Sequence, residues 1–388
     1  METNVTDAAI GSGEHLHKSC FINGQVHTAP TVIVNATIRV IVGSLGVLGN
    51  TLVVVVFIKY KKLFHQLKTT LVVNQSVIDG FVSVLLVMLS FLTRKLHGGV
   101  DGVSVELYCK LWLSQIVLWG LITSSTYNLM AISVERYLAV VHPLRYKVSF
   151  TKTKLNVLVA VIWCFGVVFI ASFVVPTTGV VHGTCYVSYF WPSRDAARAI
   201  AALQTFVNLL MPILVHSVCY ARILTTLRMR ISRVTQEDVV ASTSHTGRTG
   251  VSDVTATTPG VTTHGKDGNA GTGSPMSTST ADARAAPVPT RSADRKRSSL
   301  EAQNEKATRN IVTTFAIITA CYFICWIPNK IYIILYFWGE VSTFSGVYHA
   351  TAVLAFLNCC VNPIIFVGKY DAFKTGLAMV FRCRQRNG

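Results

Sequence analysis

Residues 111–141 of this 388-residue chain, LWLSQIVLWGLITSSTYNLMAISVERYLAVV, decide its fold class. The stretch contains no charged side chain before Glu135 and Arg136, which stand near its C-terminal end. A bilayer core about 30 Å thick requires roughly 20 mostly apolar residues for one helical crossing. We therefore expect residues 111–141 to cross a membrane as a helix, with Glu135 and Arg136 at one membrane face.

Six further runs are mostly apolar and similar in length. They cover about residues 32–58, 70–92, 155–176, 199–224, 311–337 and 345–367. The whole chain is 51% hydrophobic and 14% charged, whereas soluble domains carry about 25% charged residues. Only helices and closed barrels satisfy their backbone polar groups in lipid, and the alternating segments of a barrel are absent from the sequence. The sequence therefore predicts an all-α membrane protein, a bundle of seven transmembrane helices.

Positive charge is unevenly distributed between the predicted loops. The net charge of +17 would by itself be compatible with a nucleic-acid partner. However, basic side chains cluster in the loops after the first and third helices: Lys59, Lys61, Lys62, Lys68, Arg145, Lys147, Lys152 and Lys154. The positive-inside rule places these loops in the cytoplasm. We expect a multi-pass plasma-membrane protein with an extracellular N-terminus and no nucleic-acid partner.

Composition divides the chain into five parts. They are an extracellular tail (1–31), transmembrane helices one to five (32–228), a third cytoplasmic loop (229–306), helices six and seven (307–368), and an amphipathic helix with a cytoplasmic tail (369–388). The first part is polar, and the third is rich in Ser, Thr, Gly, Ala and Pro. Both are predicted to be disordered, because neither can bury a core.

Two short sequences in the polar parts suggest covalent modification. Asn4-Val5-Thr6 fits the glycosylation pattern. Residues 295–299, RKRSS, resemble a site for a kinase that recognises basic residues, and the alternative is a solvated linker that happens to contain serine.

The C-terminal part is predicted to form a short eighth helix. Tyr370, Phe373, Leu377 and Val380 recur at steps of three or four residues, which favours an amphipathic helix that contacts lipid along the inner membrane face. Cys383 follows this pattern and is a candidate for palmitoylation. The alternative is a plain cytosolic thiol.

Each predicted helix contains a short motif of polar, proline or aromatic residues. In chain order these are Gly49-Asn50, Asp79 within LVVNQSVID, Glu135-Arg136-Tyr137 with His142-Pro143-Leu144, Trp163, Pro212 with Tyr220, Cys325-Trp326-Ile327-Pro328, and Asn362-Pro363. Each motif alone is common by chance. The ordered set resembles the rhodopsin-like (class A) G-protein-coupled receptors over nearly the whole chain outside the tail and the third loop. The resemblance implies a receptor, not an enzyme, that binds an extracellular ligand and activates heterotrimeric G proteins, with kinases and arrestin acting on the third loop.

The resemblance assigns a switch to the cytoplasmic half of the bundle. Glu135 and Arg136 would pair at rest, and ligand would bias the release of the arginine toward the G protein, with Tyr137 and Tyr220 nearby. The alternative is a helix-terminal ion pair of little energetic weight. The other residues assigned to switching and coupling are Pro143, Leu144, Trp326, Pro328, Asn362 and Pro363.

The chain departs from the family pattern at three places around this switch. Thr308 stands where many relatives have an acid that forms a second lock on the arginine. Phe366 replaces a tyrosine of helix seven. Thr126 and Tyr322 replace an apolar residue and a phenylalanine in the core. We expect a loosely held resting state and ligand-free signalling that Arg136→Ala reduces.

Asp79 is the only acidic residue deep in the helical runs, so its charge needs a partner. The resemblance places Ser125, Asn358 and Asn362 around it, with oxygen atoms suited to an allosteric sodium ion. The alternative is a protonated, hydrogen-bonded carboxyl group without an ion. No other cofactor is expected.

The resemblance also pairs Cys109, at the outer start of helix three, with Cys185 in the outer loop after helix four, as a disulfide suited to the oxidising exterior. The segment from Cys109 to Arg136 is about two residues longer than in relatives, so counts from its two ends disagree. They place either Ile116 or Leu118 where amine receptors have an aspartate. Because neither is acidic, a monoamine ligand is not expected.

The outer half of the bundle offers cations, amides and aromatic rings to a ligand. Lys330 stands one helical turn beyond Trp326 and has no acidic helix partner at its depth. An intramembrane lysine is a functional-site hypothesis, and its role would be to bind a ligand carboxylate, such as a peptide C-terminus. The alternatives are a water-solvated lysine or a pair with the loop acid Glu340. The predicted pocket residues are Arg39, Gln115, Trp119, Gln204, Trp326, Asn329, Lys330 and His349.

The character of this pocket is similar to that of peptide receptors, so we expect a neuropeptide-like ligand. A lipid, a small carboxylate and a receptor that signals without ligand are the alternatives. A transporter is disfavoured because no internal repeat is visible. A membrane enzyme is disfavoured because His216 stands alone, without the nucleophile–base pair or metal cluster that catalysis needs.

Overall fold

The computed structural model of the chain describes residues 19–22, 25–64, 69–91, 103–181, 184–246, 291–341 and 346–386. Seven helical segments of these residues are long and apolar enough to span a membrane. They are Ile33–Lys59, Thr69–Phe91, Val103–Val141, Lys152–Val174, Arg194–Arg230, Lys306–Trp338 and Gly346–Lys369. The predicted seven-helix membrane bundle is confirmed.

Four spans are single helices: α1 (Ala29–Lys59), α2 (Thr69–Phe91), α6 (Lys152–Val174) and α10 (Gly346–Lys369). The third span joins α3 (Val103–Leu107), the π-helix η3 (Tyr108–Leu113) and α4 (Ile116–Val141). The fifth joins α7 (Arg194–Thr205), the π-helix η4 (Phe206–Leu210) and the start of α8 (Met211–Thr246). The sixth belongs to α9 (Arg291–Trp338).

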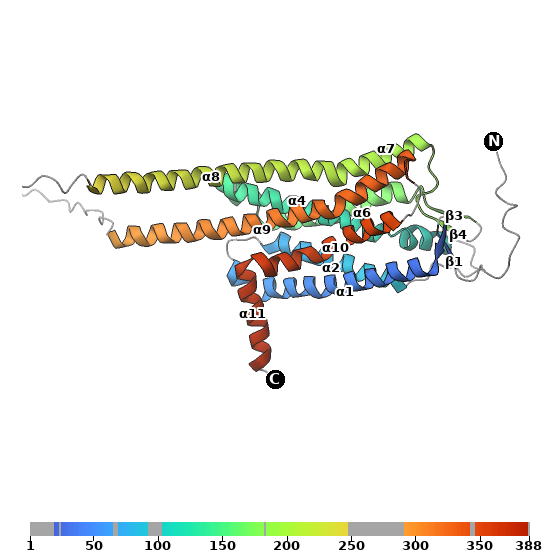
Figure 1. Cartoon of the computed structure of the whole chain (residues 1–388), viewed down its shortest axis with the longest axis horizontal. Coiled ribbons are helices and arrows are strands. Elements are labelled where there is room, and N and C mark those ends of the chain that lie inside the picture. Colours follow the sequence, from blue (N-terminus) through green and yellow to red (C-terminus); the bar gives the residue numbers. More distant parts are fainter. Residues whose placement is uncertain are drawn as a thin grey trace, which may run out of the picture. The chain divides into compact units, whose positions relative to one another are not determined.

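Shorter elements connect the spans. The 3₁₀-helix η2 (Lys61–Phe64) follows α1, α5 (Pro143–Ser149) follows α4, and α11 (Asp371–Arg386) follows α10. The strands β3 (Gly179–Val181) and β4 (Thr184–Tyr186) form an antiparallel hairpin after α6. Figure 1 shows α1, α2 and α10 side by side, with α11 leading away across their direction.

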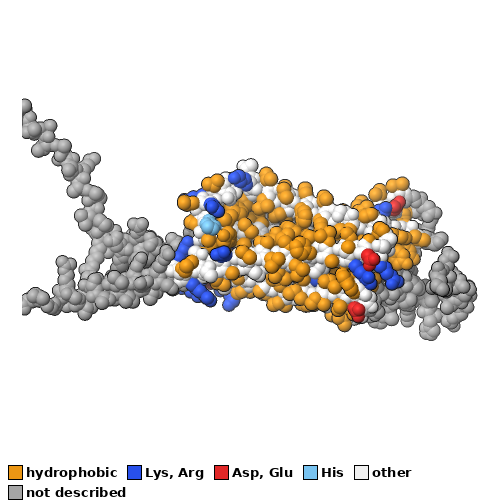
Figure 2. All heavy atoms as spheres, turned by 90° about the horizontal axis from the view of Figure 1, so that it is seen from above, with side chains coloured by type: hydrophobic (Ala, Val, Ile, Leu, Met, Phe, Trp, Pro, Cys, Tyr) orange, Lys and Arg blue, Asp and Glu red, His pale blue; other side chains and the backbone are white. Residues whose placement is uncertain are grey.

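Large hydrophobic side chains cover the outside of the bundle. Leu48, Val168 and Ile364 are 70%, 66% and 69% exposed. On the face seen in Figure 2, hydrophobic side chains form a continuous band, and most charged side chains lie toward its two ends. An apolar surface of this extent fits contact with lipid chains, where only helices satisfy their own backbone.

Helices α4 and α6 approach closely where two glycines meet. A Cβ atom on Gly166 would collide with the backbone oxygen of Gly120 and would lie 2.8 Å from the backbone nitrogen of Ser124. The Ser124 hydroxyl also donates to the carbonyl of Ile162 across the same interface, at 3.0 Å. Small residues of this kind bring membrane helices together, because close packing and interhelical hydrogen bonds hold them in lipid.

The prediction of a wholly disordered N-terminal tail is wrong for residues 19–28. They form two antiparallel strands, β1 (Ser19–Ile22) and β2 (Gln25–Thr28), with Ser19 opposite Thr28. The missed sequence signal is Asn23-Gly24 between two short hydrophobic stretches, a pattern that favours a two-residue hairpin turn.

The prediction of disorder over the whole of 229–306 is also wrong at both ends of that segment. Helix α8 continues to Thr246, and α9 begins at Arg291. Neither end contains glycine or proline, the residues least compatible with a helix interior. The composition of the loop as a whole concealed these two stretches. The RKRSS sequence falls in α9, but its side chains lie outside the described part of the chain, and so do Asn4 and the side chain of Cys383.

The eighth helix is present as α11, but the apolar residues at and just before its start contact protein instead of lipid. Phe373 is fully buried and Tyr370 is 6% exposed. The Phe373 ring centroid lies 5.9 Å from that of Phe57 in α1, and the Tyr370 centroid lies 5.7 Å from that of Phe64 in η2. Phe366 belongs to the same aromatic cluster, so a phenylalanine fits there without a hydroxyl that would need a partner.

Candidate functional site

A cavity of about 520 Å³ lies among α4, α6, α7, α9 and α10 and is bordered by the segment 187–191. Its volume is typical of ligand pockets. Aromatic rings supply much of its wall: Trp119, Phe173, Tyr189, Trp191, Tyr322, Trp326, Tyr332, Tyr336, Phe337 and Tyr348. Such a wall can bind large apolar groups and still direct hydroxyl and indole N–H groups at polar ones.

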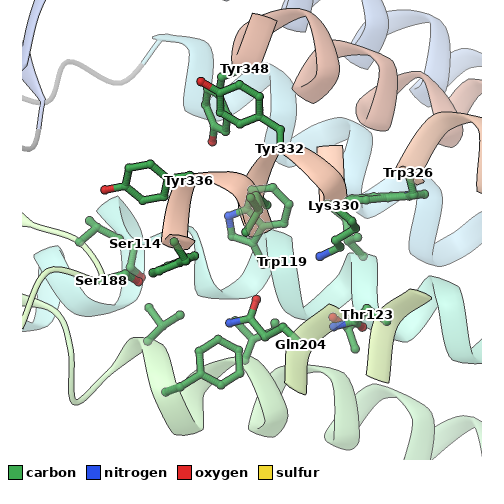
Figure 3. A pocket seen from close by; sticks show the side chains of 18 of the residues that line it. Ser114, Trp119, Thr123, Ser188, Gln204, Trp326, Lys330, Tyr332, Tyr336 and Tyr348 are labelled. Carbon is green, nitrogen blue, oxygen red and sulfur yellow. The ribbon is translucent and has the colours of Figure 1, made fainter. Parts of the chain in front are cut away.

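Lys330 brings a cation into this aromatic cavity. Lys330 is only 9% exposed, and its Nζ atom lies 5.6 Å from the centroid of the Trp326 ring. Figure 3 shows the ammonium end directed toward the space between Trp119, Gln204 and Thr123. Of the described residues that line the cavity, Lys330 alone carries a formal charge.

The carboxylate partner considered for Lys330 from the sequence is not in place. Glu340 is exposed, and no ion pair joins Lys330 to any carboxylate in the described ranges. The face of Trp326 attracts the ammonium but does not neutralise it. A buried charge of this kind favours a ligand that supplies the opposite charge.

Half of the predicted pocket residues line the cavity, namely Trp119, Gln204, Trp326 and Lys330. Arg39, Gln115, Asn329 and His349 are not among the lining residues. The guanidinium of Arg39 lies instead 5.5 Å from the centroid of the Phe356 ring. Asn329 and His349 adjoin the lining residues Lys330 and Tyr348, and neighbours on a helix point about 100° apart.

A disulfide fixes the loop beside the cavity. Cys109 in η3 and Cys185 in β4 are bonded, with their Cα atoms 5.7 Å apart. The disulfide that the resemblance predicted is therefore present. Cys185 lies opposite Val180 in the β3–β4 hairpin, and two residues later the chain reaches the segment 187–191, which contributes Val187, Ser188, Tyr189 and Trp191 to the cavity lining.

The structure has an irregular segment between Cys109 and Arg136, just before α4 begins, where the additional length expected from the resemblance would fit. Residues 108–113 form a π-helix, a wider turn that accommodates additional residues. Gln115 then adopts a left-handed conformation, with φ of 58° and ψ of 30°. Such an irregular segment would account for the disagreement between counts from the two ends of the span, and Gln115, which was predicted to line the cavity, does not.

The floor of the cavity links α4, η4 and α9. The ring centroids of Trp119 and Trp326 lie 6.5 Å apart in an edge-on contact. Below them, the hydroxyls of Thr126 and Tyr322 are 2.8 Å apart. The Tyr322 hydroxyl also donates to the backbone carbonyl of Asn208 at 2.9 Å. That carbonyl belongs to the π-helix η4, where the regular backbone pattern is interrupted.

Asp79 lies farther along the bundle and is 2% exposed. Two of the three partners predicted for it donate hydrogen bonds: the Ser125 hydroxyl to Oδ1 at 2.9 Å and Asn362 Nδ2 to Oδ2 at 2.7 Å. The third, Asn358, lines a cavity of about 10 Å³ beside Asp79. Gln75, which the sequence analysis did not select, donates through Nε2 to both carboxylate oxygens, at 3.2 and 3.0 Å.

The predicted Glu135–Arg136 pair is formed and buried. Arg136 Nη2 lies 2.7 Å from Glu135 Oε1, and the two side chains are 4% and 0% exposed. A buried pair is not the weak surface contact that the sequence left open. Tyr146 in α5 was missed: its hydroxyl donates to the same Glu135 oxygen at 3.0 Å. Burial, and then the negative charge of Glu135, raise the pKa of Tyr146 above its usual range.

Tyr220 belongs to a polar cluster between α4, α8 and α9. It accepts a hydrogen bond from the Ser133 hydroxyl at 3.1 Å and lies 3.4 Å from the Thr319 hydroxyl. His216 Nδ1 is 2.8 Å from Ser133 Oγ. His216 is thus a buried, hydrogen-bonded core residue, and no metal-binding cluster forms among the described residues.

The remaining switch residues lie in or beside the transmembrane helices. Pro328 and Pro363 stand inside α9 and α10, where each removes a backbone donor. The Tyr137 hydroxyl oxygen lies 3.1 Å from Nε2 of His142. Pro143 begins α5, and Leu144 is 80% exposed.

The sequence also matches a family model and many curated proteins. The model described as "7 transmembrane receptor (rhodopsin family)" covers residues 49–366. The chain is 23% identical over 375 residues to galanin receptor 2b of Danio rerio (91% of this chain, 76% of the relative). It is 24% identical over 372 residues to the cholecystokinin receptor of Xenopus laevis (89% and 77%). It is 25% identical over 366 residues to the human cholecystokinin receptor type A (87% and 78%).

The family match extends over most of the chain, contains the buried Glu135–Arg136 pair, the disulfide-linked loop and five complete spans, and includes parts of the first and the seventh span. These features and the match agree with the class expected from the sequence motifs. The chain belongs to the rhodopsin family of seven-transmembrane receptors, a family of signalling receptors and not of enzymes.

Proposed function

We propose that this receptor lies in the plasma membrane with its N-terminus outside, binds an extracellular peptide in the aromatic cavity, and activates a heterotrimeric G protein on the cytoplasmic side. The observation that carries the proposal is the buried Lys330 ammonium, which has no carboxylate partner among the described residues. A peptide carboxylate, at the C-terminus or on an acidic side chain, would neutralise it. The relatives named for galanin, cholecystokinin and tachykinin-like peptides support a peptide as the ligand class.

The cytoplasmic partner would bind beside the Glu135–Arg136 pair. Leu144 and Val148 on α5 are 80% and 68% exposed and stand one helical turn apart. Two exposed apolar side chains on one face offer an anchor to a G protein. Kinases and arrestin would act on residues 229–306, and lipid would surround the apolar belt.

The first experiment measures GTP exchange on added G proteins in membranes that contain the receptor, against a library of neuropeptides. At least one peptide is expected to raise exchange in a concentration-dependent way. If Arg136→Ala lowers the exchange seen without ligand but no peptide raises it, the receptor couples to G protein and the peptide assignment is overturned. A lipid or a small carboxylate that raises exchange would then replace it.

A second experiment tests the Lys330 contact with the peptide that is found. Lys330→Gln is expected to reduce potency about 10- to 100-fold, which corresponds to about 1.4–2.8 kcal/mol. Lys330→Arg, the matched control, retains the charge and should lose less. Blocking the peptide carboxylate as an amide should weaken binding to the wild type but not to Lys330→Gln. Equal losses in both receptors would exclude the ion pair.

A further inference from the structure

Three side chains of the protein donate hydrogen bonds to the carboxylate of Asp79. Oδ1 accepts hydrogen bonds from Gln75 and Ser125, and Oδ2 accepts from Gln75 and Asn362. An ionised carboxylate offers about four lone-pair sites, and each of the two oxygens has two donor groups of the protein within hydrogen-bond distance, with Gln75 Nε2 shared between them. With Gln75 in this position, the residues around Asp79 do not fit the sodium ion that was expected there.

The direction of the Gln75 amide is fixed by a chain of hydrogen bonds. The indole N–H of Trp163, which can only donate, donates to Asn74 Oδ1 at 3.0 Å. Asn74 Nδ2 then donates to Asn128 Oδ1 at 2.9 Å, and Asn128 Nδ2 donates to Gln75 Oε1 at 2.8 Å. Asn128 Nδ2 also donates to the carbonyl of Leu71, which can only accept. An amide flip at any step would therefore place two donors, or two acceptors, face to face.

It follows that Gln75 presents N–H groups, and not its oxygen, to Asp79. Gln75 Nε2 also lies 2.5 Å from the Ser125 hydroxyl oxygen, so it fills the space between the two groups expected to bind an ion. Hard cations bind oxygen ligands. The amide hydrogens would repel a cation at this point.

We propose that Gln75 takes the place of a sodium ion in this receptor and makes it insensitive to sodium. Gln75 bridges Asp79 to Ser125 with a neutral donor, and through Asn128 and Asn74 it ties this centre in α2 and α4 to Trp163 in α6. The adjacent cavity of about 10 Å³ has room for about one water molecule. An ion could use that space and the oxygens of Asn358 and Ser125 only after the amide is removed.

The test measures thermal unfolding of the purified full-length receptor in sodium chloride, potassium chloride or choline chloride at one ionic strength. The readout requires neither ligand nor G protein. The unfolding temperature of the wild type is expected to be the same in all three salts. A rise in sodium alone would show that the ion binds despite Gln75 and would overturn the proposal.

The variant Gln75→Leu removes the amide at similar volume and leaves both oxygens of Asp79 without the Gln75 donor. Its unfolding temperature is expected to rise in sodium, by about 2 °C, over that in choline. Gln75→Leu combined with Asp79→Asn is the matched control and should lose the sodium effect. If Gln75→Leu folds and shows no sodium effect, Gln75 is not what excludes the ion. Should that variant fail to fold, Gln75→Met gives the same comparison.

Discussion

The hydroxyl groups of Thr126 in α4 and Tyr322 in α9 lie 2.8 Å apart. Each hydroxyl also has a backbone carbonyl within reach, that of Asn208 for Tyr322 at 2.9 Å and that of Ile122 for Thr126 at 3.1 Å. Both residues are ones that the resemblance to the family marked as departures from its pattern. The structure shows that the two departures belong together, because either hydroxyl without the other would be a buried polar group lacking one partner.

Replacing these residues separately and together should therefore give non-additive effects. Tyr322→Phe and Thr126→Val are each expected to lower the free energy of unfolding by about 1 kcal/mol, since each leaves the other hydroxyl short of a partner. The double variant should lose less than the two single losses combined. Thermal unfolding of the three purified variants measures this coupling, and strictly additive losses would contradict it.

Tyr146 is expected to restrain signalling in the absence of ligand. A tyrosine hydroxyl is protonated at physiological pH, burial raises its pKa further, and the hydroxyl donates to Glu135. Tyr146→Phe removes this donor, loosens the Glu135–Arg136 pair, and should raise ligand-free GTP exchange several-fold. Tyr108→Phe serves as the control, because Tyr108 lies in the π-helix η3, at the other end of the span that contains Glu135 and Arg136. An unchanged rate in Tyr146→Phe would mean that the ion pair holds without it.

Gly166→Ala should destabilise the receptor by forcing α4 and α6 apart. The added Cβ has no space beside Gly120 and Ser124, and overpacking of this kind costs about 1–3 kcal/mol. The matched control is Gly368→Ala in α10, where a Cβ would meet nothing within 4 Å and alanine favours the helix. We expect a lower unfolding temperature for the first variant and an equal or higher one for the second.

Gln115→Gly tests the bend before α4. A non-glycine residue at φ of 58° carries a steric penalty of about 1–2 kcal/mol that glycine avoids. The glycine variant should therefore unfold at a higher temperature than the wild type, and Gln115→Val at a lower one because a branched side chain tolerates this conformation least. The opposite order would indicate a regular helix at this position.

The membrane itself explains why the spans could be predicted. Lipid imposes a length and an apolar composition on each helix, and these constraints act locally along the sequence. The start of the third span was harder to predict from the sequence. Residues 103–110 include Glu106 and Lys110, which pair at 2.6 Å, so charge concealed a helical turn that the structure extends to Val103.

The site was predicted less completely, because its partners come from different helices. Gln75 and Asp79 are four residues apart and so share one helix face, a signal that was available in the sequence. The hydrogen bond that Gln75 Oε1 accepts from Asn128, and the amide orientation that Trp163 sets through Asn74, depend on tertiary packing. The contact between Tyr146 and Glu135 depends on it too, because the helix is interrupted at His142 between them. Lys330 was identified because a lysine inside an apolar run is conspicuous without any structure.

The widened turn at Tyr108–Leu113 has a practical consequence for comparing this receptor with its relatives. An insertion that is absorbed locally leaves the residues on either side in their usual places, so two separate alignments are valid, one on each side of Ser114 and Gln115. Chimeric receptors that exchange the outer end of this helix should be joined at that point. A junction placed deeper, within α4, would carry the offset inward and turn Trp119 and Thr126 away from the cavity.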